Sequence, residues 1–379
     1  MLPLLVTLGI LGASAVVLVY QGVALWLGRQ MPKLDPAPPG VGPGAAPRVG
    51  VVIAARDEEA DLPATLDSLL AQDYPAVDIV VVDGGSTDGT RAVIEARAPR
   101  VRRVAEPALP DGWVGKSWAC WTGAQAVQGE WLWFLDADVR LAPGALRTVL
   151  AWAERERADL ASVGVRVAMV GFWEKVVLPF FLQVAITYFR VPRTNRPGSR
   201  SAFANGQCWI TPRAAYARVG GHAAVRSAVN EDVAIARRYR AEGLHLRVAW
   251  GPELGTTRMY RDRHEMFEGL LKNTRDPEFS PVREVGFLAG FVGLFLLPLG
   301  VLPVGLLEGS GPVAAVGAVL WCALFAKHVV FTRAVRGSPA YGLLYPVAVG
   351  FYIALFGTSL VRKLRKRPIA WKGRSYPTG

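Results

Sequence analysis

An apolar run that ends in two acids, Trp131-Leu132-Trp133-Phe134-Leu135-Asp136-Ala137-Asp138, decides the fold of this chain. The apolar residues predict a buried strand at 131–135, and the two carboxylates follow where that strand reaches solvent. Ligands of open α/β sheets bind at the carboxyl ends of strands. Asp136 and Asp138 point to the same side of an extended segment, so together they can hold Mg²⁺ or Mn²⁺, which in turn bind substrate phosphates. The alternative for an isolated Asp-x-Asp is a solvated strand end.

Strand-like and helix-like segments alternate around this run. Apolar runs predict strands at 49–55, 79–83 and 131–135, and a further strand is expected at 102–105. Residues 57–72 have helical spacing, and helices are also expected at 90–97 and 116–128. This alternation is typical of βαβ units, so the predicted fold class is α/β with a mainly parallel sheet. The Pro- and Gly-rich residues 29–47 before the first strand predict a linker.

The strand predicted at 79–83 also ends in an acid. Asp83 opens the turn Gly84-Gly85-Ser86-Thr87-Asp88-Gly89, in which glycine lets the backbone approach a ligand closely. A carboxylate at this place can accept the N3–H of a uracil ring. The alternative is a turn-forming aspartate that bonds its own backbone. Two acid-ended strands in one sheet favour the ligand-binding interpretation of both.

An acidic pair, Glu231-Asp232, precedes a helical stretch at 233–242. Acids at a helix N-terminus are favourable because of the helix dipole alone, which is the structural alternative. In the functional interpretation the pair is catalytic, and Asp232 removes a proton from an attacking hydroxyl. Such a base must come within hydrogen-bond reach of its nucleophile.

Three basic residues, Lys116, Arg258 and Arg261, are candidates for binding the phosphates of a nucleotide donor. Arginine suits bidentate phosphate contacts. For the two arginines the alternative is a basic patch next to a membrane. Lys116 is not a P-loop lysine, because the Gly-x-x-x-x-Gly-Lys spacing is absent.

Apolar segments at both ends predict membrane spans, although one of them, 312–332, contains Lys327 and His328. The chain is 51% hydrophobic, with a mean hydropathy of +0.26. Residues 1–28 contain a stretch long enough to span a bilayer, which takes roughly 20 apolar residues. Residues 284–361 contain three further segments, at 286–307, 312–332 and 338–361. A cleaved signal peptide is the alternative for the first segment, but its positive residues would precede the apolar stretch, whereas Arg29 and Lys33 follow it.

The charge pattern predicts a multi-pass protein of the cell membrane with a cytoplasmic catalytic domain. The net charge is +12, and no nucleic-acid recognition module is visible, so we expect attraction to anionic lipid and no nucleic-acid partner. Arg29 and Lys33 place the following domain in the cytoplasm, and the basic tail at 362–379 also prefers that side. Three later spans would put the tail outside. One apolar segment is therefore expected to be re-entrant or interfacial, and 338–361, interrupted by Gly and Pro, is the candidate.

A further apolar, aromatic stretch lies near 171–191. A helix in the membrane interface fits this composition, and it would lie beside the catalytic cleft and accept a lipid. The alternative is a core helix of the catalytic domain, which we place at 48–280.

Taken in order, these residues resemble the family-2 inverting glycosyltransferases, which have the Rossmann-like GT-A fold. The residues that carry the resemblance are Val51-Val52-Ile53-Ala54-Ala55-Arg56-Asp57-Glu58-Glu59, Val81-Val82-Asp83-Gly84-Gly85-Ser86-Thr87-Asp88-Gly89-Thr90, Asp136-Ala137-Asp138 and Glu231-Asp232. The resemblance implies that Ala55, Arg56, Glu58 and Asp83 bind the nucleotide. It also implies that Asp136 and Asp138 bind the metal, and that Asp232 is the base.

Within that family the chain looks most similar to membrane-associated enzymes of carotenoid and hopanoid pathways, including the diaponeurosporenoate glucosyltransferases and hopene-associated glycosyltransferases. The supporting segments are Gly115-Lys116-Ser117-Trp118-Ala119-Cys120, Asn205-Gly206-Gln207-Cys208, Gly220-Gly221-His222, Arg258-Met259-Tyr260, Glu268-Gly269, Lys272-Asn273 and Trp371-Lys372-Gly373-Arg374. Two departures are Arg56-Asp57, where the family often has Asn, and Gly84, where a second Asp is common. The Gln-x-x-Arg-Trp motif of processive synthases is absent, which favours transfer of a single sugar.

The resemblance therefore implies transfer of one hexose from a nucleotide sugar, UDP-glucose, to a hydrophobic lipid acceptor such as a carotenoid or other isoprenoid. Two alternatives stay open. One is a polyprenyl-phosphate glycosyltransferase, whose phosphate acceptor needs no base. The other is a non-catalytic membrane scaffold with a degenerate transferase domain.

Overall fold

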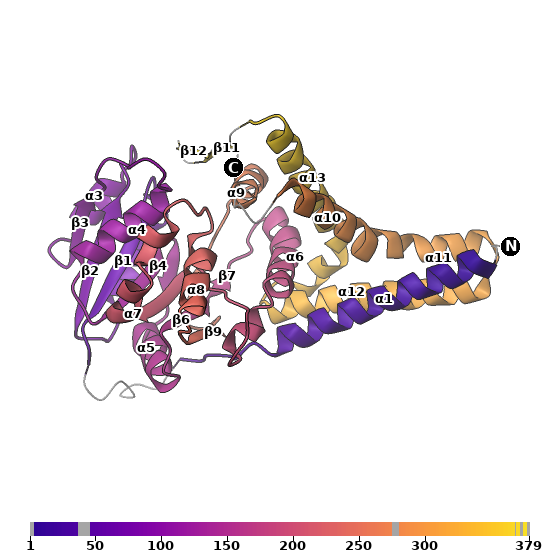
Figure 1. Ribbon diagram of the computed structural model, residues 1–379, viewed down its shortest axis with the longest axis horizontal. Helices are drawn as coiled ribbons and strands as arrows, with labels where there is room; N and C mark the ends of the chain where they lie inside the picture. Colours follow the sequence, from indigo (N-terminus) through magenta and orange to yellow (C-terminus); the bar gives the residue numbers. More distant parts are fainter. Residues whose placement is uncertain (1–3, 37–45, 275–279, 368, 372–373, 377–379) are drawn as a thin grey trace. The chain divides into compact units, whose positions relative to one another are not determined.

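The computed structural model describes residues 4–36, 46–274, 280–367, 369–371 and 374–376. The chain forms two compact units (Figure 1). The sheet unit contains Met31–Ala168 and Phe189–Met259, and the helical unit contains Met1–Gln30, Met169–Tyr188 and Tyr260–Gly379. Parts of the predicted linker and of the basic tail lie outside the described residues.

A seven-stranded sheet in the order β3-β2-β1-β4-β8-β6-β9 forms the centre of the sheet unit. Its strands are β1 (Val49–Ala55), β2 (Val77–Asp83), β3 (Val101–Ala105), β4 (Trp131–Asp136), β6 (Leu160–Gly164), β8 (Cys208–Pro212) and β9 (Leu246–Trp250). Strand β8 runs antiparallel to both of its neighbours, and the other pairings are parallel. A small second sheet joins β5 (Val139–Leu141), β10 (Gly255–Thr257) and β7 (Arg166–Val167). The prediction of an α/β fold with a mainly parallel sheet is confirmed.

Helices cover both faces of the large sheet. One face packs against α2 (Leu62–Leu70), α3 (Thr90–Glu95) and α5 (Ala145–Arg155), and the other against α4 (Gly115–Ala126), α7 (Arg213–Arg218) and α8 (Glu231–Ala241). The 3₁₀ turns η1 (Val191–Asn195) and η2 (Gly221–Val225) complete the unit. Alternate residues of β1 enter opposite cores, Val51 and Ile53 the first and Val52 the second. A Cβ on Gly123 of α4 would lie 2.4 Å from Val52 Cγ1, so glycine lets α4 press directly onto β1.

The helix predicted at 57–72 is shorter than expected, because α2 begins only at Leu62. Asp57 has a left-handed φ of 53°, which a right-handed helix does not allow. Its N–H donates to Ser86 Oγ at 3.1 Å, and the N–H of Glu58 donates to Thr90 Oγ1 at 2.7 Å. The segment between β1 and α2 therefore binds the next βα loop instead of extending the helix.

Long apolar helices dominate the helical unit. Its elements are α1 (Leu4–Arg29), α6 (Phe172–Tyr188), α9 (Arg263–Asn273), α10 (Pro281–Phe291), the π-helix η3 (Val292–Leu296), α11 (Leu297–Leu307), α12 (Gly311–Ala334), η4 (Pro339–Leu344), α13 (Tyr345–Leu364) and the hairpin β11 (Ile369–Trp371) and β12 (Arg374–Tyr376). Within the described residues, four segments are long and apolar enough to cross a membrane: Leu5–Arg29, Pro281–Leu307, Gly311–Ala334 and Pro339–Leu364.

Packing within the helical unit distinguishes α13 from the other three candidate spans. Helices α11 and α12 form a close hairpin, in which a Cβ on Gly317 would lie 2.3 Å from Leu302 N. Helix α1 packs along α12, whereas α13 packs against α10, α6 and α9. Helix α6 therefore belongs with the terminal helices, although we placed its residues within the catalytic domain at 48–280. The interfacial roles of α6 and of residues 338–361 stay predictions.

Candidate active site

The two aspartates of the opening motif lie at the carboxyl end of β4. Asp136 is the last residue of the strand, and its N–H donates to the Gln207 carbonyl oxygen at 3.1 Å. Asp138 lies in the turn to β5, where its Oδ2 accepts from Thr257 Oγ1 at 2.6 Å. Both side chains are half-buried. Strands β8 and β10, distant in sequence, thus hold the pair.

Lys116 joins this pair to the acids of α8. The lysine lies in the first turn of α4, and its Nζ is 2.8 Å from Asp136 Oδ1 and 2.8 Å from Glu231 Oε1. Burial disfavours the charged amine, but the carboxylates of Asp136 and Glu231 outweigh burial and hold the pKa of Lys116 well above its usual value. The lysine therefore carries its charge and links the two acidic motifs.

Asp232 is held by two backbone donors at the start of α8. Its Oδ2 accepts from the N–H of Gly206 at 2.7 Å, and its Oδ1 accepts from the N–H of Val233 at 2.8 Å. Burial, with the neighbouring carboxylate of Glu231, raises the pKa of Asp232 to about 7. A base with a pKa near the working pH is suited to proton transfer.

Gly206 lies at the centre of this cluster. A Cβ at this position would be 3.0 Å from Lys116 Nζ and 3.2 Å from Asp232 Oδ2. Lys116 and the acids of α8 therefore meet at one glycine, which the sequence analysis quoted without giving it a role. Gly206 lies two residues before β8, and this position could have pointed to a role at the site. However, only the order of the strands shows that β8 pairs with β4.

The acidic pair at the end of β4 fits a hard divalent cation held jointly with a substrate. Burial, with the nearby charge of Asp136, raises the pKa of Asp138 to about 7. Across the described residues, no group of three or more His, Cys, Asp or Glu side chains is placed to hold a metal. Mg²⁺ usually binds one or two carboxylates, several waters and substrate phosphates, so two carboxylates suffice. The predicted metal role of Asp136 and Asp138 stays a prediction.

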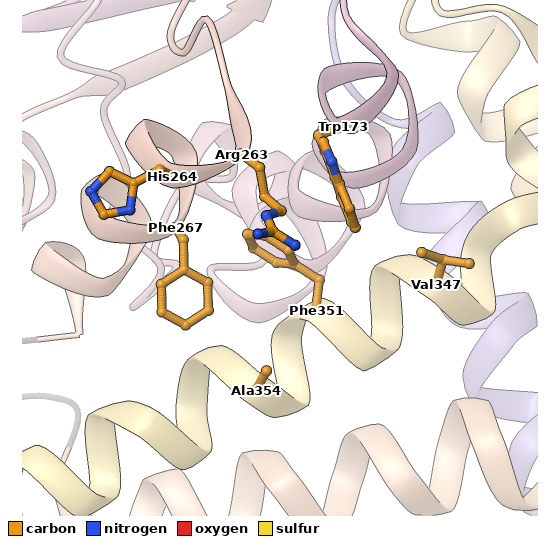
Figure 2. Close-up of a pocket in the computed structure, with 7 residues that line it drawn as sticks. All are labelled: Trp173, Arg263, His264, Phe267, Val347, Phe351 and Ala354. Atoms are coloured by element: carbon orange, nitrogen blue, oxygen red, sulfur yellow. The ribbon is translucent and has the colours of Figure 1, made fainter.

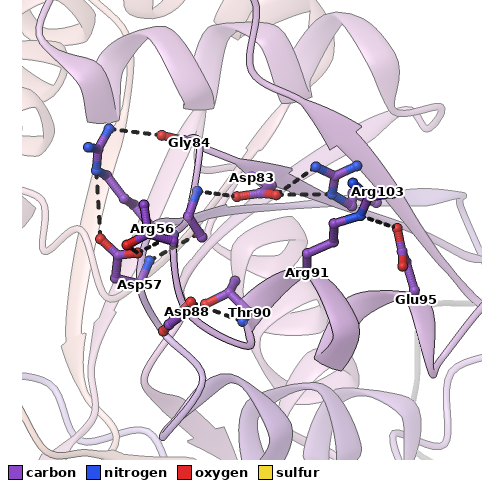
Figure 3. Close-up of polar contacts among 11 residues, drawn as sticks. Arg56, Asp57, Asp83, Gly84, Asp88, Thr90, Arg91, Glu95 and Arg103 are labelled. Atoms are coloured by element: carbon purple, nitrogen blue, oxygen red, sulfur yellow. Dashed lines mark hydrogen bonds and ion pairs between the residues drawn. The ribbon is translucent and has the colours of Figure 1, made fainter.

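Asp83 is buried at the end of β2, and only 3% of its surface is exposed (Figure 3). Arg103 of β3 donates to its Oδ2 through Nε at 3.0 Å and Nη2 at 2.8 Å, and the N–H of Ser86 donates to Oδ1 at 2.9 Å. Burial opposes ionisation, yet these hydrogen bonds from Ser86 and Arg103 hold the pKa of Asp83 below its usual value. The side chain of Ser86 also bonds this carboxylate, so donors from two elements hold both of its oxygens in place. The sequence analysis missed Arg103.

The turn after β1 is hydrogen-bonded to the turn after β2, beside Asp83 (Figure 3). Ala55, the last residue of β1, lies in register with Asp83. Arg56 Nη1 donates to the Gly84 carbonyl oxygen at 2.9 Å, and Asp57 Oδ1 accepts from the N–H of Thr87 at 2.8 Å. The structure thus brings Ala55, Arg56, Glu58 and Asp83 to one corner at the carboxyl ends of two adjacent parallel strands.

Comparison with known proteins assigns the domain that carries Asp83, Asp136 and Gly206 to a family. A family profile described as "Glycosyl transferase family 2" matches residues 50–220, which include both strand-end acids and Gly206. Residues 50–220 form a family 2 glycosyl transferase domain. The predicted family and the predicted enzyme class, a glycosyltransferase, are confirmed.

Two known proteins show how far the similarity of this glycosyltransferase extends. It is 27% identical over 340 residues to 4,4'-diaponeurosporenoate glycosyltransferase of Staphylococcus aureus (strain USA300), which covers 86% of this chain and 87% of that protein. Its fold is similar to that of the mannosyltransferase PcManGT from Pyrobaculum calidifontis, solved in complex with GDP-Man and Mn²⁺. That structural match has a TM-score of 0.53 and 19% identity, and covers 93% of this chain and 97% of the other. The predicted GT-A fold is confirmed.

The two arginines predicted to bind phosphate fall in different units of the glycosyltransferase. Arg258 directly follows β10 in the sheet unit. Arg261 belongs to the helical unit, where its N–H donates to Glu265 Oε2 at 2.6 Å. Their phosphate contacts stay predictions.

The helical unit has an aromatic cavity of about 420 Å³ between α6, α9 and α13 (Figure 2). It is lined by Trp173, Arg263, His264, Phe267, Val347, Phe351 and Ala354. The guanidinium of Arg263 lies 5.5 Å from the centre of the Trp173 ring, and the rings of Phe267 and Phe351 meet edge to face with centroids 5.5 Å apart. The cavity thus combines apolar walls with one cation.

Proposed function

We propose that the protein transfers one hexose, with inversion, from UDP-glucose to a hydrophobic lipid acceptor such as a carotenoid or another isoprenoid. The single observation that carries this proposal is one cluster, in which Lys116, Glu231 and Asp232 surround Gly206 and Lys116 also pairs with Asp136. A donor-binding acid and a held base in one cluster can perform a direct displacement.

Asp232 is the proposed general base. It takes the proton of an acceptor hydroxyl while the hydroxyl oxygen bonds to the anomeric carbon, and the bond from that carbon to the diphosphate oxygen breaks. Such base assistance contributes typically 10²–10⁴-fold. The N–H groups of Gly206 and Val233 fix the carboxylate, so an oxygen lone pair keeps one direction toward the acceptor. With a carboxylate acceptor, Asp232 orients the acceptor instead.

The donor side of the proposal uses the remaining strand-end residues. Asp83 is proposed to accept the N3–H of uracil, within the corner formed by Ala55, Arg56 and Glu58. Asp136 and Asp138 would hold Mg²⁺ or Mn²⁺, which when bound neutralises charge on the leaving diphosphate. Lys116, Arg258 and Arg261 are the proposed basic contacts of the phosphates.

A lipid acceptor is supported by the extent of the similarity and by the aromatic cavity. The similarity to the diaponeurosporenoate enzyme covers 86% of the chain, and so reaches well beyond the transferase domain at 50–220. The cavity of α6, α9 and α13 has a volume within the range typical of ligand sites, about 300–1,000 Å³. Apolar walls with the cation of Arg263 among them suit an amphipathic molecule (Figure 2). We propose that the cavity holds part of a lipid acceptor, in a multi-pass protein whose catalytic domain faces the cytoplasm.

A donor and acceptor assay tests the proposed function. Full-length protein in lipid nanodiscs receives UDP-glucose or GDP-mannose labelled in the sugar, with Mg²⁺, Mn²⁺ or EDTA, and a lipid extract containing isoprenoid alcohols and carboxylates. We expect metal-dependent UDP release matched by label in the organic phase, and a β-linked product from the α-linked donor. Transfer from GDP-mannose alone, or UDP release without labelled lipid, would contradict the proposal. Lipid profiles of a deletion strain then identify the natural acceptor through the glycolipid that disappears.

A further inference from the structure

A second cavity, of about 420 Å³, lies in the sheet unit away from the catalytic cluster. It is lined by Arg196, Pro197, Gly198, Ser199, Arg200, Arg240, Gly243, His245 and Arg247, and we call it the arginine pocket. Asp232 occupies the first turn of α8 and Arg240 the last, so about 12 Å of helix separates the two sites at 1.5 Å per residue. The arginine pocket is therefore not part of the transferase centre.

The charges around the arginine pocket are unbalanced. Four arginines line it and no acidic residue does. Arg240 donates through Nη2 to the Thr194 carbonyl oxygen at 2.6 Å and through Nε to the Ser201 carbonyl oxygen at 3.2 Å, so both of its hydrogen bonds go to neutral groups. The nearby acids are Glu156, 3.2 Å from Arg247 Nε, and Asp159, which accepts the N–H of His245 at 2.8 Å. Burial lowers the pKa of Arg240, and the charge of Arg247 lowers it further, so the two guanidinium groups repel each other.

The donor groups of this pocket match a phosphate group. The guanidinium fork fits phosphate oxygens in bidentate geometry, and such charged hydrogen bonds are about twice as strong as neutral ones. Ser199 adds a hydroxyl, whose oxygen already accepts the N–H of Ser201 at 3.1 Å and whose proton can be donated. The lining contains no Phe, Tyr or Trp, so its polar contacts are mainly with charged groups.

The elements around the arginine pocket are connected directly to apolar helices. The loop at 196–200 follows soon after α6, which ends at Tyr188. Strand β9 carries Arg247 and ends at Trp250, which pairs with Lys33 just after α1 ends at Arg29. Chain connectivity thus ties the pocket to one candidate membrane span, α1, and to α6, whose interfacial role is predicted, and basic residues near a membrane surface are suited to meet the phosphates of lipid headgroups.

We propose that the arginine pocket binds a phosphate group, carried by an anionic phospholipid headgroup or by a free phosphate ester. Bound phosphate offsets the repulsion between Arg240 and Arg247 and joins the loop at 196–200 to the end of α8. The site acts independently of sugar transfer, so its failure leaves the proposed reaction untouched.

The test uses full-length protein purified in detergent and the variants Arg200→Glu and Arg200→Gln. Arg200 is an exposed lining residue, and Arg238→Glu, on an exposed residue of α8 outside the lining, is the matched control. Native mass spectrometry counts retained phosphatidylglycerol against phosphatidylcholine, and calorimetry measures inorganic phosphate. We expect Arg200→Glu to lose at least ten-fold in phosphate or phosphatidylglycerol binding, Arg200→Gln less, and the control to match wild type.

The two measurements identify the source of the phosphate. Preferential retention of phosphatidylglycerol that falls in Arg200→Glu assigns a lipid headgroup. Inorganic phosphate binding that falls in Arg200→Glu, with unchanged lipid retention, assigns a free phosphate ester. Equal binding of both probes by Arg200→Glu and Arg238→Glu, at unchanged melting temperature, would overturn the proposal.

Discussion

Replacing Lys116 by methionine tests whether this lysine holds the acidic motifs together. Methionine keeps most of the side-chain length but leaves Asp136 and Glu231 without the cation that lies 2.8 Å from each. Removing one partner of a buried ion pair costs about 3–5 kcal/mol. Lys116 is 37% exposed, Asp136 28% and Glu231 8%, so solvent screens part of this effect, and we expect a loss of about 2 kcal/mol in the free energy of unfolding.

The same change should reduce sugar transfer much more than it reduces stability. Without the lysine, neighbouring carboxylates repel one another, and the geometry that joins β4 to α8 relaxes. Loss of one preorganised charged group in an active site costs about 10²–10³ in kcat. Transfer of labelled sugar and thermal unfolding are measured in the same nanodisc preparation.

Two controls make the lysine experiment decisive. Lys33→Met removes a lysine from an exposed ion pair with Asp35, in which the side chains are 54% and 59% exposed, and should change stability by less than about 0.5 kcal/mol. Lys116→Arg keeps the charge and should retain most of the stability. A Lys116→Met protein that melts and turns over like wild type would refute the reasoning.

Three further changes probe other parts of the account. Gly206→Ala adds a methyl group 3.0 Å from Lys116 Nζ and 3.2 Å from Asp232 Oδ2, so kcat should fall at least ten-fold. The control Gly350→Ala, at a position with open space around it, should leave kcat unchanged. Equal activity of the two variants would contradict a role for Gly206. Ala354→Phe fills the aromatic cavity and should raise the KM for the lipid without changing the KM for the nucleotide sugar, whereas Val361→Phe, on the same helix outside the cavity, should change neither. Burial, with the charge of Lys116, lowers the pKa of His222 to about 3, so near pH 6.5 this histidine binds a proton only in the unfolded chain. The free energy of unfolding should therefore fall as the pH drops below 6.5, by up to about 1.4 kcal/mol per pH unit. Chemical unfolding of the full-length protein between pH 5 and 8 should show a shallower slope for His222→Phe, and an unchanged slope would count against a neutral buried histidine.

Local sequence patterns were sufficient for the elements that carry the acids. The apolar runs before Asp83 and Asp136 predicted β2 and β4, and the acidic pair predicted the start of α8. Each of these signals lies within one element, where side-chain periodicity and the terminal residue are read directly.

The contacts that assemble the site could not be predicted, because they join elements distant in sequence. Lys116 reaches Asp136 and Glu231 only because α4 packs on the sheet, and Gly206 reaches Asp232 only because β8 inserts antiparallel beside β4. Arg103 meets Asp83 across the β2–β3 pairing. The helix boundary at Leu62 differed from the prediction because the turn at 57–59 bonds to the next loop, and helical periodicity carries no information on such bonds.

The central claim is that Asp232 is the base of the transferase centre and does not itself bind the nucleotide. The most direct measurement compares wild type with Asp232→Asn for UDP binding and for transfer of labelled glucose to lipid, in the same nanodiscs. The amide keeps the size of the side chain but cannot take the proton, so turnover should fall by about 10²–10⁴-fold while UDP affinity changes little. Wild-type turnover in Asp232→Asn would contradict the account and remove Asp232 from the mechanism.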